Sequence, residues 1–398
     1  MLTPVSDTPV PSARLSSLDV FRGLTIAAML VVNNPGSWKH VYPPLRHAEW
    51  HGCTFTDLVF PFFLFAVGLS MAFSRRLGGG LAQTPGEMAR TSLGVLKRAA
   101  ILVAMGLLLN ALSVLLRDPI DFSRLRLPGV LQRIGVCFLL ASLVVLYLPR
   151  VWQYLLGGFI LVGYWFLLSQ VPVPGFDDAA TRLSPAGNMV AHVDQIVLGP
   201  AHMYTALGAA HDPEGLLSTL PALVTTLMGF WTGAWLRTAP RGASTAGVLA
   251  LAGLVAMAAG WLWSLAGFPL NKNLWTSSYV LFTAGWALLT LAGCWLACQT
   301  LGTRDGWRWA GRALWPMEVM GLNAILAFVG SGVLVRLMGL IKIDAAAGPV
   351  ALPRYIFTRL ESAGLSPTDA SLAYALLTLG LWWLVLWVCY RQRWFWKI

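Results

Sequence analysis

The sequence predicts an all-α fold, a polytopic integral membrane bundle of about ten transmembrane helices. Hydrophobic residues make up 57% of the 398 residues and charged residues only 11%, whereas soluble domains carry about 25% charged residues. Apolar stretches of the length that crosses about 30 Å of hydrocarbon, roughly 20 residues, recur along the chain. These stretches are continuously apolar and do not alternate at every second residue, which favours helices over a β-barrel.

Ten spans follow from these stretches. They are expected at residues 18–34, 55–74, 92–116, 129–149, 151–169, 218–237, 244–266, 277–300, 317–340 and 370–390. The first sixteen residues are polar and lack the basic region and small-residue cleavage site of a removed signal, so the first span is expected to be an uncleaved anchor. Residues 1–15 are then a cytoplasmic tail, and 16–398 form a single transmembrane domain without a polar linker or an internal repeat.

The charge distribution predicts the orientation. Of the 28 Lys and Arg residues, fifteen fall on the segments that share a side with the N-terminus and ten on the longer segments opposite. Cytoplasmic loops carry this excess of basic residues, so both termini are expected in the cytoplasm, in a bacterial inner membrane. The net charge of +11 is therefore assigned to the membrane surface and not to nucleic acid.

The six histidines all fall on the outer side in this topology: His40, His47, His51, His192, His202 and His211. Three interpretations remain open, namely scattered interfacial residues, a metal site, and one histidine that acts as a general base beside a buried pocket. No cysteine accompanies the group, and no metal is expected.

Polar residues within and beside the spans form two groups. The outer group consists of Asn33, Asp57, Asn110, Gln132, Arg133, Asn271, Lys272 and Asn273. The inner group consists of Arg22, Arg98, Glu318 and Asn323, and its cations are candidates to hold phosphates. An ionisable residue in a membrane normally faces a partner or a water-filled cavity, so the two groups predict a polar path through the bundle. A structural ion pair between Asp57 and Arg133 is the simpler alternative for those two residues. The residues alone leave a pore, a transporter and a transmembrane enzyme open.

An ordered series of motifs resembles the heparan-α-glucosaminide N-acetyltransferase family and its bacterial transmembrane acyltransferase relatives. It runs from about residue 14 to 330 and comprises LDVFRG (18–23), RHAEWHG (46–52), DLVFPF (57–62), PGVLQRIG (128–135), DPEG (212–215), NKNLW (271–275) and GLNAI (321–325). Each motif is weak alone, and the order makes the series specific.

The resemblance implies a transmembrane acyltransferase domain that passes acetyl from cytosolic acetyl-CoA to a glucosamine amine on the opposite side, in a homodimer. His47 matches the family's active histidine, whereas His51 has no such counterpart. Asn33 matches an asparagine beside that histidine. The stretch between Asn33 and His47 is longer than in the family, and no large luminal domain precedes the first span. The second departure leads us to expect a small free amino sugar or a cell-wall fragment as acceptor.

The chemistry assigns roles to these residues. An amine attacks a thioester only when unprotonated, so His47 is expected to be the base and Asp57 to orient its ring. Asn33 or Asn271 is a candidate donor to the oxyanion, and Asp212, Glu214, Asn271 and Asn273 are expected to bind the sugar. Arg22, Arg98, Gln132, Arg133 and Asn323 are expected to bind acetyl-CoA. Direct transfer is favoured over an acetyl-histidine intermediate because it needs fewer steps.

Two other function classes stay open. A permease for an amino sugar or a cell-wall fragment also needs a polar path, although the paired halves with broken helices that transporters often show are not evident in the sequence. A binding or scaffold protein does not need the buried charges Asp57, Arg133 and Glu318.

Overall fold

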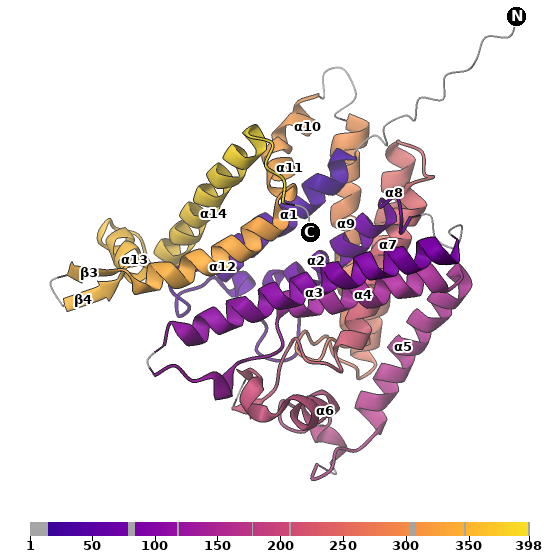
Figure 1. Cartoon of the computed structure of the whole chain (residues 1–398), viewed down its shortest axis with the longest axis horizontal. Coiled ribbons are helices and arrows are strands. Elements are labelled where there is room, and N and C mark those ends of the chain that lie inside the picture. Colours follow the sequence, from indigo (N-terminus) through magenta and orange to yellow (C-terminus); the bar gives the residue numbers. More distant parts are fainter. Residues whose placement is uncertain are drawn as a thin grey trace, which may run out of the picture.

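Most of the described residues lie in helices, which confirms the predicted all-α polytopic membrane class (Figure 1). The computed structural model describes residues 15–78, 84–117, 119–176, 178–206, 208–301, 308–345 and 348–396. The predicted N-terminal tail lies outside these residues, apart from Leu15.

The helices that form the bundle are α1 (Ser16–Asn33), α2 (Phe55–Ala72), α3 (Pro85–Leu115), α4 (Val130–Tyr147), α5 (Arg150–Gln170), α7 (Thr219–Leu236), α8 (Ala243–Leu265), α9 (Ser277–Trp295), α11 (Trp315–Gly321), α12 (Ala324–Leu340) and α14 (Pro367–Arg391). The shorter helices are α6 (Met189–Leu198), α10 (Arg308–Ala313) and α13 (Leu352–Ser362). Two antiparallel hairpins complete the described elements: β1 (Thr205–Ala206) with β2 (Ala209–Ala210), and β3 (Lys342–Ala345) with β4 (Gly348–Ala351).

The number of spans is close to the expectation of ten. Among the described residues, eight helices are long and apolar enough to cross a membrane, and a ninth span arises if the bent pair α11 and α12 counts as one. The remaining expected span, 218–237, is the 18-residue helix α7, which falls outside that count. The span at 277–300 extends beyond α9 through a π-helical turn, Leu296–Leu301.

The ninth expected span, 317–340, is not one continuous helix. It breaks between Gly321 and Ala324, and α11 and α12 meet at 78°. Asn323 immediately precedes α12, and its side chain binds the C-terminal segment: Nδ2 donates to the carbonyl of Trp394, and Oδ1 accepts from the backbone N–H of Trp396. Main chain at a helix break is tolerated in a membrane only where protein or a cavity surrounds it, and Asn323 is fully buried.

Small residues allow the central helices to approach closely. A Cβ atom on Gly68 of α2 would lie 1.8 Å from the carbonyl oxygen of Thr226 in α7, and one on Gly229 of α7 would lie 2.0 Å from that of Phe65. Gly23 of α1 and Gly321 of α11 make the same kind of contact. Lipid tails are as apolar as leucine, so close van der Waals packing of this kind drives helix association in membranes.

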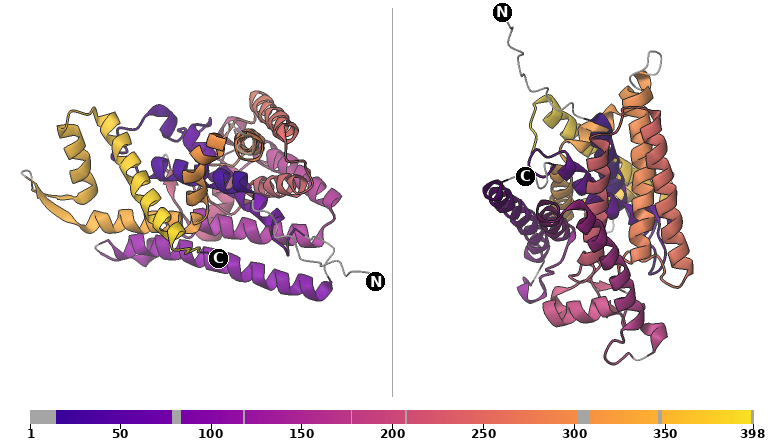
Figure 2. Two further views of the ribbon diagram at one scale, coloured as in Figure 1. Left: turned by 90° about the horizontal axis from the view of Figure 1, so that it is seen from above. Right: turned by 90° about the vertical axis from the view of Figure 1, so that its right-hand side faces the viewer.

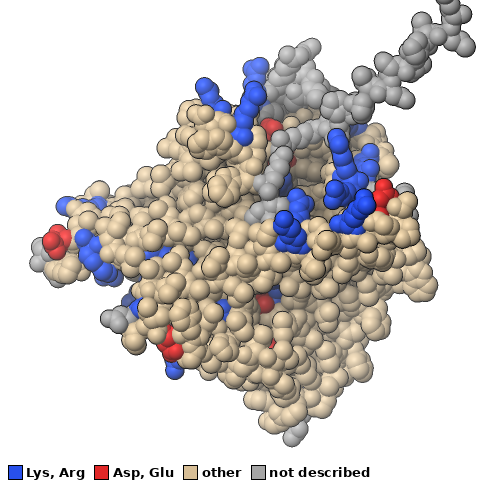
Figure 3. Space-filling model, in the orientation of Figure 1, with Lys and Arg blue, Asp and Glu red and all other residues tan. Residues whose placement is uncertain are grey.

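The two ends of the bundle differ. At the basic end α1 begins and α2 and α7 end, and the basic residues Arg75, Arg76, Arg90, Arg237 and Arg241 lie there; Lys and Arg gather towards the upper right of Figure 3. The opposite, loop end carries the connections from α1 to α2, α3 to α4, α5 to α7 and α8 to α9. Helix α6 lies across this end, and α8 and α9 run side by side along one edge (Figure 2).

Candidate active site

The loop before α2 brings His47 to a buried carboxylate at the loop end. The Nδ1 atom of His47 lies 2.6 Å from Oδ1 of Asp57. The side chain of Asp57 is only 1% exposed, whereas that of His47 is 48% exposed, so the carboxylate is sheltered and the ring remains open to a ligand. The expected contact is confirmed. Asp57 does not pair with Arg133, and the simpler structural alternative is therefore wrong.

The sequence around Asp57 explains why its carboxylate is fixed. Thr54 and Asp57 form a capping box at the start of α2. Oδ2 of Asp57 accepts three hydrogen bonds of 3.0 Å, from the backbone N–H groups of Ala48 and Thr54 and from the Thr54 hydroxyl. Oδ1 is left to face His47. If Nδ1 carries the proton, Nε2 presents its lone pair away from the carboxylate, as the base of a catalytic triad does.

Lys272 is the third member of this cluster, although its place in the sequence marks it only as one of several polar residues before a span. Its Nζ atom lies 3.2 Å from Nδ1 and 3.3 Å from Nε2 of His47, and 3.9 Å from Oδ1 of Asp57. Equal distances to both ring nitrogens place the ammonium beside the ring and off the Nε2 lone pair. The side chain is 17% exposed, and burial lowers the pKa of Lys272, against the attraction of Asp57.

A strained turn holds Lys272 in place. Trp275 has a φ of +51°, a conformation that is rare for bulky residues and is often found at functional sites. Its fully buried ring packs edge-on against Phe60 of α2 and Tyr279 of α9. The Tyr279 hydroxyl donates to the backbone carbonyl of Asp57 at 2.5 Å. The two loops that carry His47 and Lys272 are thus fixed to the same pair of helices.

Two asparagines flank the cluster. Nδ2 of Asn271 lies 3.2 Å from Nδ1 of His51, and Oδ1 accepts from the backbone of Leu274. Burial lowers the pKa of His51. The half-buried side chain of Asn273 makes no hydrogen bond with another described residue, and its backbone carbonyl faces Nε2 of His211.

Asp212 and Glu214 are placed differently from expectation. Arg126, which no motif in the sequence marks, donates through Nε (2.8 Å) and Nη2 (2.6 Å) to the two oxygens of Asp212, and it also contacts Glu214. Asp212 is fully buried. Although its burial opposes the charge, the hydrogen bonds and charge of Arg126 hold the pKa of Asp212 below its usual value. The buried carboxylate of Asp212 therefore supports its own loop, where it also accepts from the backbone N–H groups of Tyr204 and Glu214.

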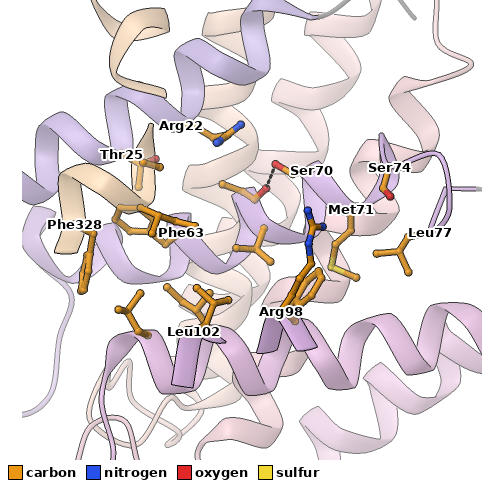
Figure 4. A pocket seen from close by; sticks show the side chains of 17 residues that line it. Arg22, Thr25, Phe63, Ser70, Met71, Ser74, Leu77, Arg98, Leu102 and Phe328 are labelled. Carbon is orange, nitrogen blue, oxygen red and sulfur yellow. Dashed lines mark hydrogen bonds between the residues drawn. The ribbon is translucent and has the colours of Figure 1, made fainter. Parts of the chain in front are cut away.

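A cavity of about 260 Å³ near the basic end brings Arg22 and Arg98 together, as expected from the sequence. Arg22 comes from α1, where it also pairs with Asp19 at 3.4 Å, and Arg98 extends from α3 into the cavity (Figure 4). Ser70 and Ser74 of the α2 segment add polar groups, and Ala324 and Ile325 line it just after the helix break. Arg98 makes no hydrogen bond within the described part of the chain.

A second cavity, of about 230 Å³, lies between α1, α3, α4 and α12 towards the loop end. Asn33, Gln132 and Arg126 line it. Asn33 makes no hydrogen bond with His47, so the structure does not join these two residues as the resemblance implies. Leu131 and Phe328 line both cavities, so two apolar side chains separate them.

Arg133 and Asn323 line neither cavity. Nη2 of the fully buried Arg133 donates to the carbonyl of Gly215 at 2.7 Å and to the Ser218 hydroxyl at 2.5 Å. Its guanidinium lies 5.3 Å from the centre of the Trp275 ring. Asn323 is occupied by the C-terminal segment. Both residues therefore make hydrogen bonds that hold parts of the protein together.

Fold and site together define a class: a polytopic helical membrane protein with a histidine–carboxylate pair, flanked by a lysine, at one end of the bundle and a cationic cavity towards the other.

Comparison with known proteins identifies the family. The sequence model described as "Heparan-alpha-glucosaminide N-acetyltransferase, catalytic" matches residues 14–237, more than half of the chain, and the chain belongs to this family. It is 27% identical to the heparan-alpha-glucosaminide N-acetyltransferase of Homo sapiens and 26% identical to that of Mus musculus, over 97% of this chain and 60% of each relative. The chain thus spans about 60% of the length of these relatives.

Proposed function

We propose that this protein transfers the acetyl group of acetyl-CoA to the amine of an amino sugar, with His47 as the general base. The observation that carries the proposal is the cluster of His47, Asp57 and Lys272, a base with a fixed tautomer beside a cation in a partly open site. A general base must lie within hydrogen-bond reach of the proton it takes, and Nε2 of His47 has its lone pair free for the amine.

The proposed step requires a proton to leave the amine and the negative charge on the carbonyl oxygen to be stabilised. The amine nitrogen attacks the thioester carbonyl carbon while its proton passes to Nε2 of His47. Asp57 stabilises the resulting imidazolium. The carbonyl oxygen becomes an oxyanion, and the ammonium of Lys272, 3.3 Å from Nε2, lies where it can stabilise that charge. The C–S bond then breaks, and the proton leaves His47 for the CoA thiolate.

Acetyl-CoA is proposed to enter from the basic end. Arg22 and Arg98 line a cavity there and are suited to charge-assisted hydrogen bonds with phosphates. On the acceptor side, the amide of Asn273, which has no hydrogen-bond partner among the described residues, is proposed to meet sugar hydroxyls, with Asn271 two positions before it. Glu214, whose Oε2 atom is held by Arg126, is proposed to meet the sugar through its other carboxylate oxygen.

The orientation belongs to the same proposal. The basic end is assigned to the cytoplasm by the positive-inside rule, so that His47 faces the outside of a bacterial inner membrane and both termini lie in the cytoplasm. Residues 16–398 act as one transmembrane acyltransferase domain, and assembly into a homodimer follows from the family alone.

A permease remains the second candidate function, and two observations favour it. Two cavities are separated by the side chains of Leu131 and Phe328, and α11 and α12 form a broken helix of the kind found in transporters, which the sequence did not reveal. The third member of the cluster, Lys272, favours the enzyme, because a transport path does not need a cation held against a base.

The experiment that separates them uses purified protein in lipid vesicles with acetyl-CoA and glucosamine. The proposal expects release of free CoA in step with N-acetylglucosamine, and no accumulation of acetyl-protein when acetyl-CoA is given alone. Uptake of unmodified glucosamine without release of CoA contradicts the enzyme and supports the permease.

A further inference from the structure

A third cavity, of about 490 Å³, lies between α1, α2 and α9. Its lining is almost entirely apolar, with Leu58 and Phe62 from α2, Ala28 from α1, and Phe282 and Trp286 from α9. None of these residues has a part in the proposed transfer step, and the cavity adjoins the one that Arg22 and Arg98 line at a single shared residue, Thr25.

The end of this cavity that lies towards the loop end of the bundle adjoins the catalytic cluster. Cys53, Thr54 and Phe55 line it, and the Thr54 hydroxyl donates to Oδ2 of Asp57 at 3.0 Å. Asp57 in turn contacts His47. A molecule in the cavity therefore has its outer end two hydrogen bonds away from the proposed base.

The lower end reaches the middle of the membrane. Thr290 lines it there, and it follows Ser277, the first residue of α9, by thirteen positions. At a rise of about 1.5 Å per residue this places Thr290 about 20 Å below the start of the helix. Half of the hydrocarbon core is about 15 Å thick, so the cavity extends through one leaflet, the outer one in the proposed orientation.

The cavity is also open to lipid along its side. The side chains of Phe55 and Trp286 are 48% and 40% exposed at its rim. The hydroxyl of Thr290 donates to the carbonyl of Trp286 at 2.9 Å, so its proton does not need a hydrogen-bond acceptor on a bound molecule. A groove that is apolar, one leaflet deep and laterally open matches a hydrocarbon chain that enters from the bilayer.

We propose that the acceptor is an amino sugar carried on a membrane lipid, whose hydrocarbon tail lies in this groove and whose amine reaches His47 at its outer end. The inference rests on the proposed acetyl transfer and specifies the class of its acceptor. Lipid tails are as apolar as the groove, so the groove contributes orientation of the head group and little hydrophobic free energy. The alternative occupant is the acyl chain of an ordinary phospholipid, and in that case the groove has no part in the reaction.

The test uses ethyl, octyl and dodecyl β-glucosaminides, which share a free amine and differ in tail length, with protein reconstituted in phosphatidylcholine bilayers. The substitution Thr290→Trp fills the lower end of the groove. The control, Leu254→Trp, adds the same bulk to a residue of α8 that is 50% exposed and does not line the groove. The readout is the ratio of kcat/KM for the dodecyl and ethyl acceptors, which partial loss of folded protein leaves unchanged.

The proposal expects this ratio to be at least about tenfold in the wild-type protein and in Leu254→Trp, and to approach one in Thr290→Trp. Ala28→Leu, which narrows the groove from α1, should lower the ratio as well. A ratio that stays high in both groove variants, or that is already near one in the wild-type protein, overturns the inference and leaves acetyl transfer to soluble amino sugars intact. Failure of all three acceptors and of glucosamine contradicts the acetyl transfer itself.

Discussion

Single residues determine what the loop end can do, and they differ in how far the sequence predicts them. His47 and Asp57 are ten positions apart in one motif-rich segment, and their contact could be predicted. Lys272 reaches the same point from 225 positions away, and the sequence shows only that it is a polar residue before a span. The sequence predicts Asp212 as a ligand of the sugar. Its actual partner, Arg126, lies 86 positions earlier, and no local pattern in the sequence indicates that the two residues pair.

Lys272→Met should lower kcat by about 10²- to 10³-fold, the usual cost of removing one oxyanion donor, and should change KM for acetyl-CoA little. Lys272→Arg keeps the charge and should retain part of the rate. Lys39→Met, at an exposed position outside the site, is the matched control. A loss that appears in KM alone would assign Lys272 to substrate binding.

The same residue predicts the alkaline side of the pH profile. Lys272 is needed in its charged form, so activity is present below its pKa and is lost as the pH rises through it. Because burial lowers that pKa, the midpoint of the alkaline limb in the profile of kcat against pH should lie below the ordinary lysine pKa of about 10.4. Lys272→Arg, which stays charged, should move the limb to higher pH; an unmoved limb would mean that another group titrates there.

Asp194 predicts a pH dependence of stability. Its carboxylate is fully buried and accepts two backbone N–H groups of the following loop through Oδ1, while burial raises its pKa to about 6. The folded protein thus binds this proton more tightly than the unfolded chain does. The contribution of the protonated Asp194 carboxyl to the free energy of unfolding is complete below about pH 4. It is lost as the pH rises through about 6, and the free energy of unfolding changes by about 3 kcal/mol.

Asp194→Asn imitates the protonated form. Its thermal midpoint in detergent should match that of the wild-type protein at pH 4 and exceed it at pH 7.5. Asp178→Asn, at an exposed position, should behave like the wild-type protein at both pH values. A difference between Asp194→Asn and the wild-type protein that stays constant across this range contradicts the account.

At the scale of helices, position is predicted well and continuity is not. Apolar stretches predict the ends of the bundle helices to within a few residues, including those of the weakest, α5, except that α3 begins at Pro85, seven residues before the expected start of its span. The break between α11 and α12 escaped detection because no proline marks it and the residues on both sides are apolar. The break depends on tertiary contacts, namely Asn323 with the C-terminal segment and Gly321 with the backbone of Asp19 in α1, and these contacts are not visible in a single segment.

Gly68→Ala tests the close contact between α2 and α7. An added Cβ would lie 1.8 Å from the Thr226 carbonyl, and since the obstacle is backbone, the helices must move apart. The thermal midpoint should fall by several degrees, as overpacking typically costs about 1–3 kcal/mol. Gly158→Ala in α5, where a Cβ meets nothing within 4 Å, should be neutral or stabilising. Equal behaviour of the two variants would show that the contact is not close.

Arg98→Ala tests how α3 contributes to the cavity near the basic end. Loss of a charge-assisted contact to phosphate should raise KM for acetyl-CoA about tenfold or more and leave KM for the amino sugar nearly unchanged. Lys97→Ala, the neighbouring exposed cation that does not line the cavity, is the control. An unchanged KM for acetyl-CoA in Arg98→Ala would remove this residue from the site.

At the scale of the whole molecule, the two candidate functional regions lie towards opposite ends of one bundle. The cationic cavity near the basic end and the His47 cluster at the loop end suit a reaction whose donor and acceptor come from different sides of a membrane. The sequence predicted this division from charge and from the placement of histidines. It could not predict that two cavities approach each other inside the bundle, because Leu131 and Phe328 are ordinary apolar residues on separate helices.

The most direct test of the central claim is the rate of acetyl transfer from acetyl-CoA to an amino sugar by purified His47→Ala. General-base catalysis contributes about 10²- to 10⁴-fold, so this variant should lose that much in kcat while it still binds acetyl-CoA, and His51→Ala, four residues further on, should keep most of its activity. Full activity in His47→Ala would contradict the account.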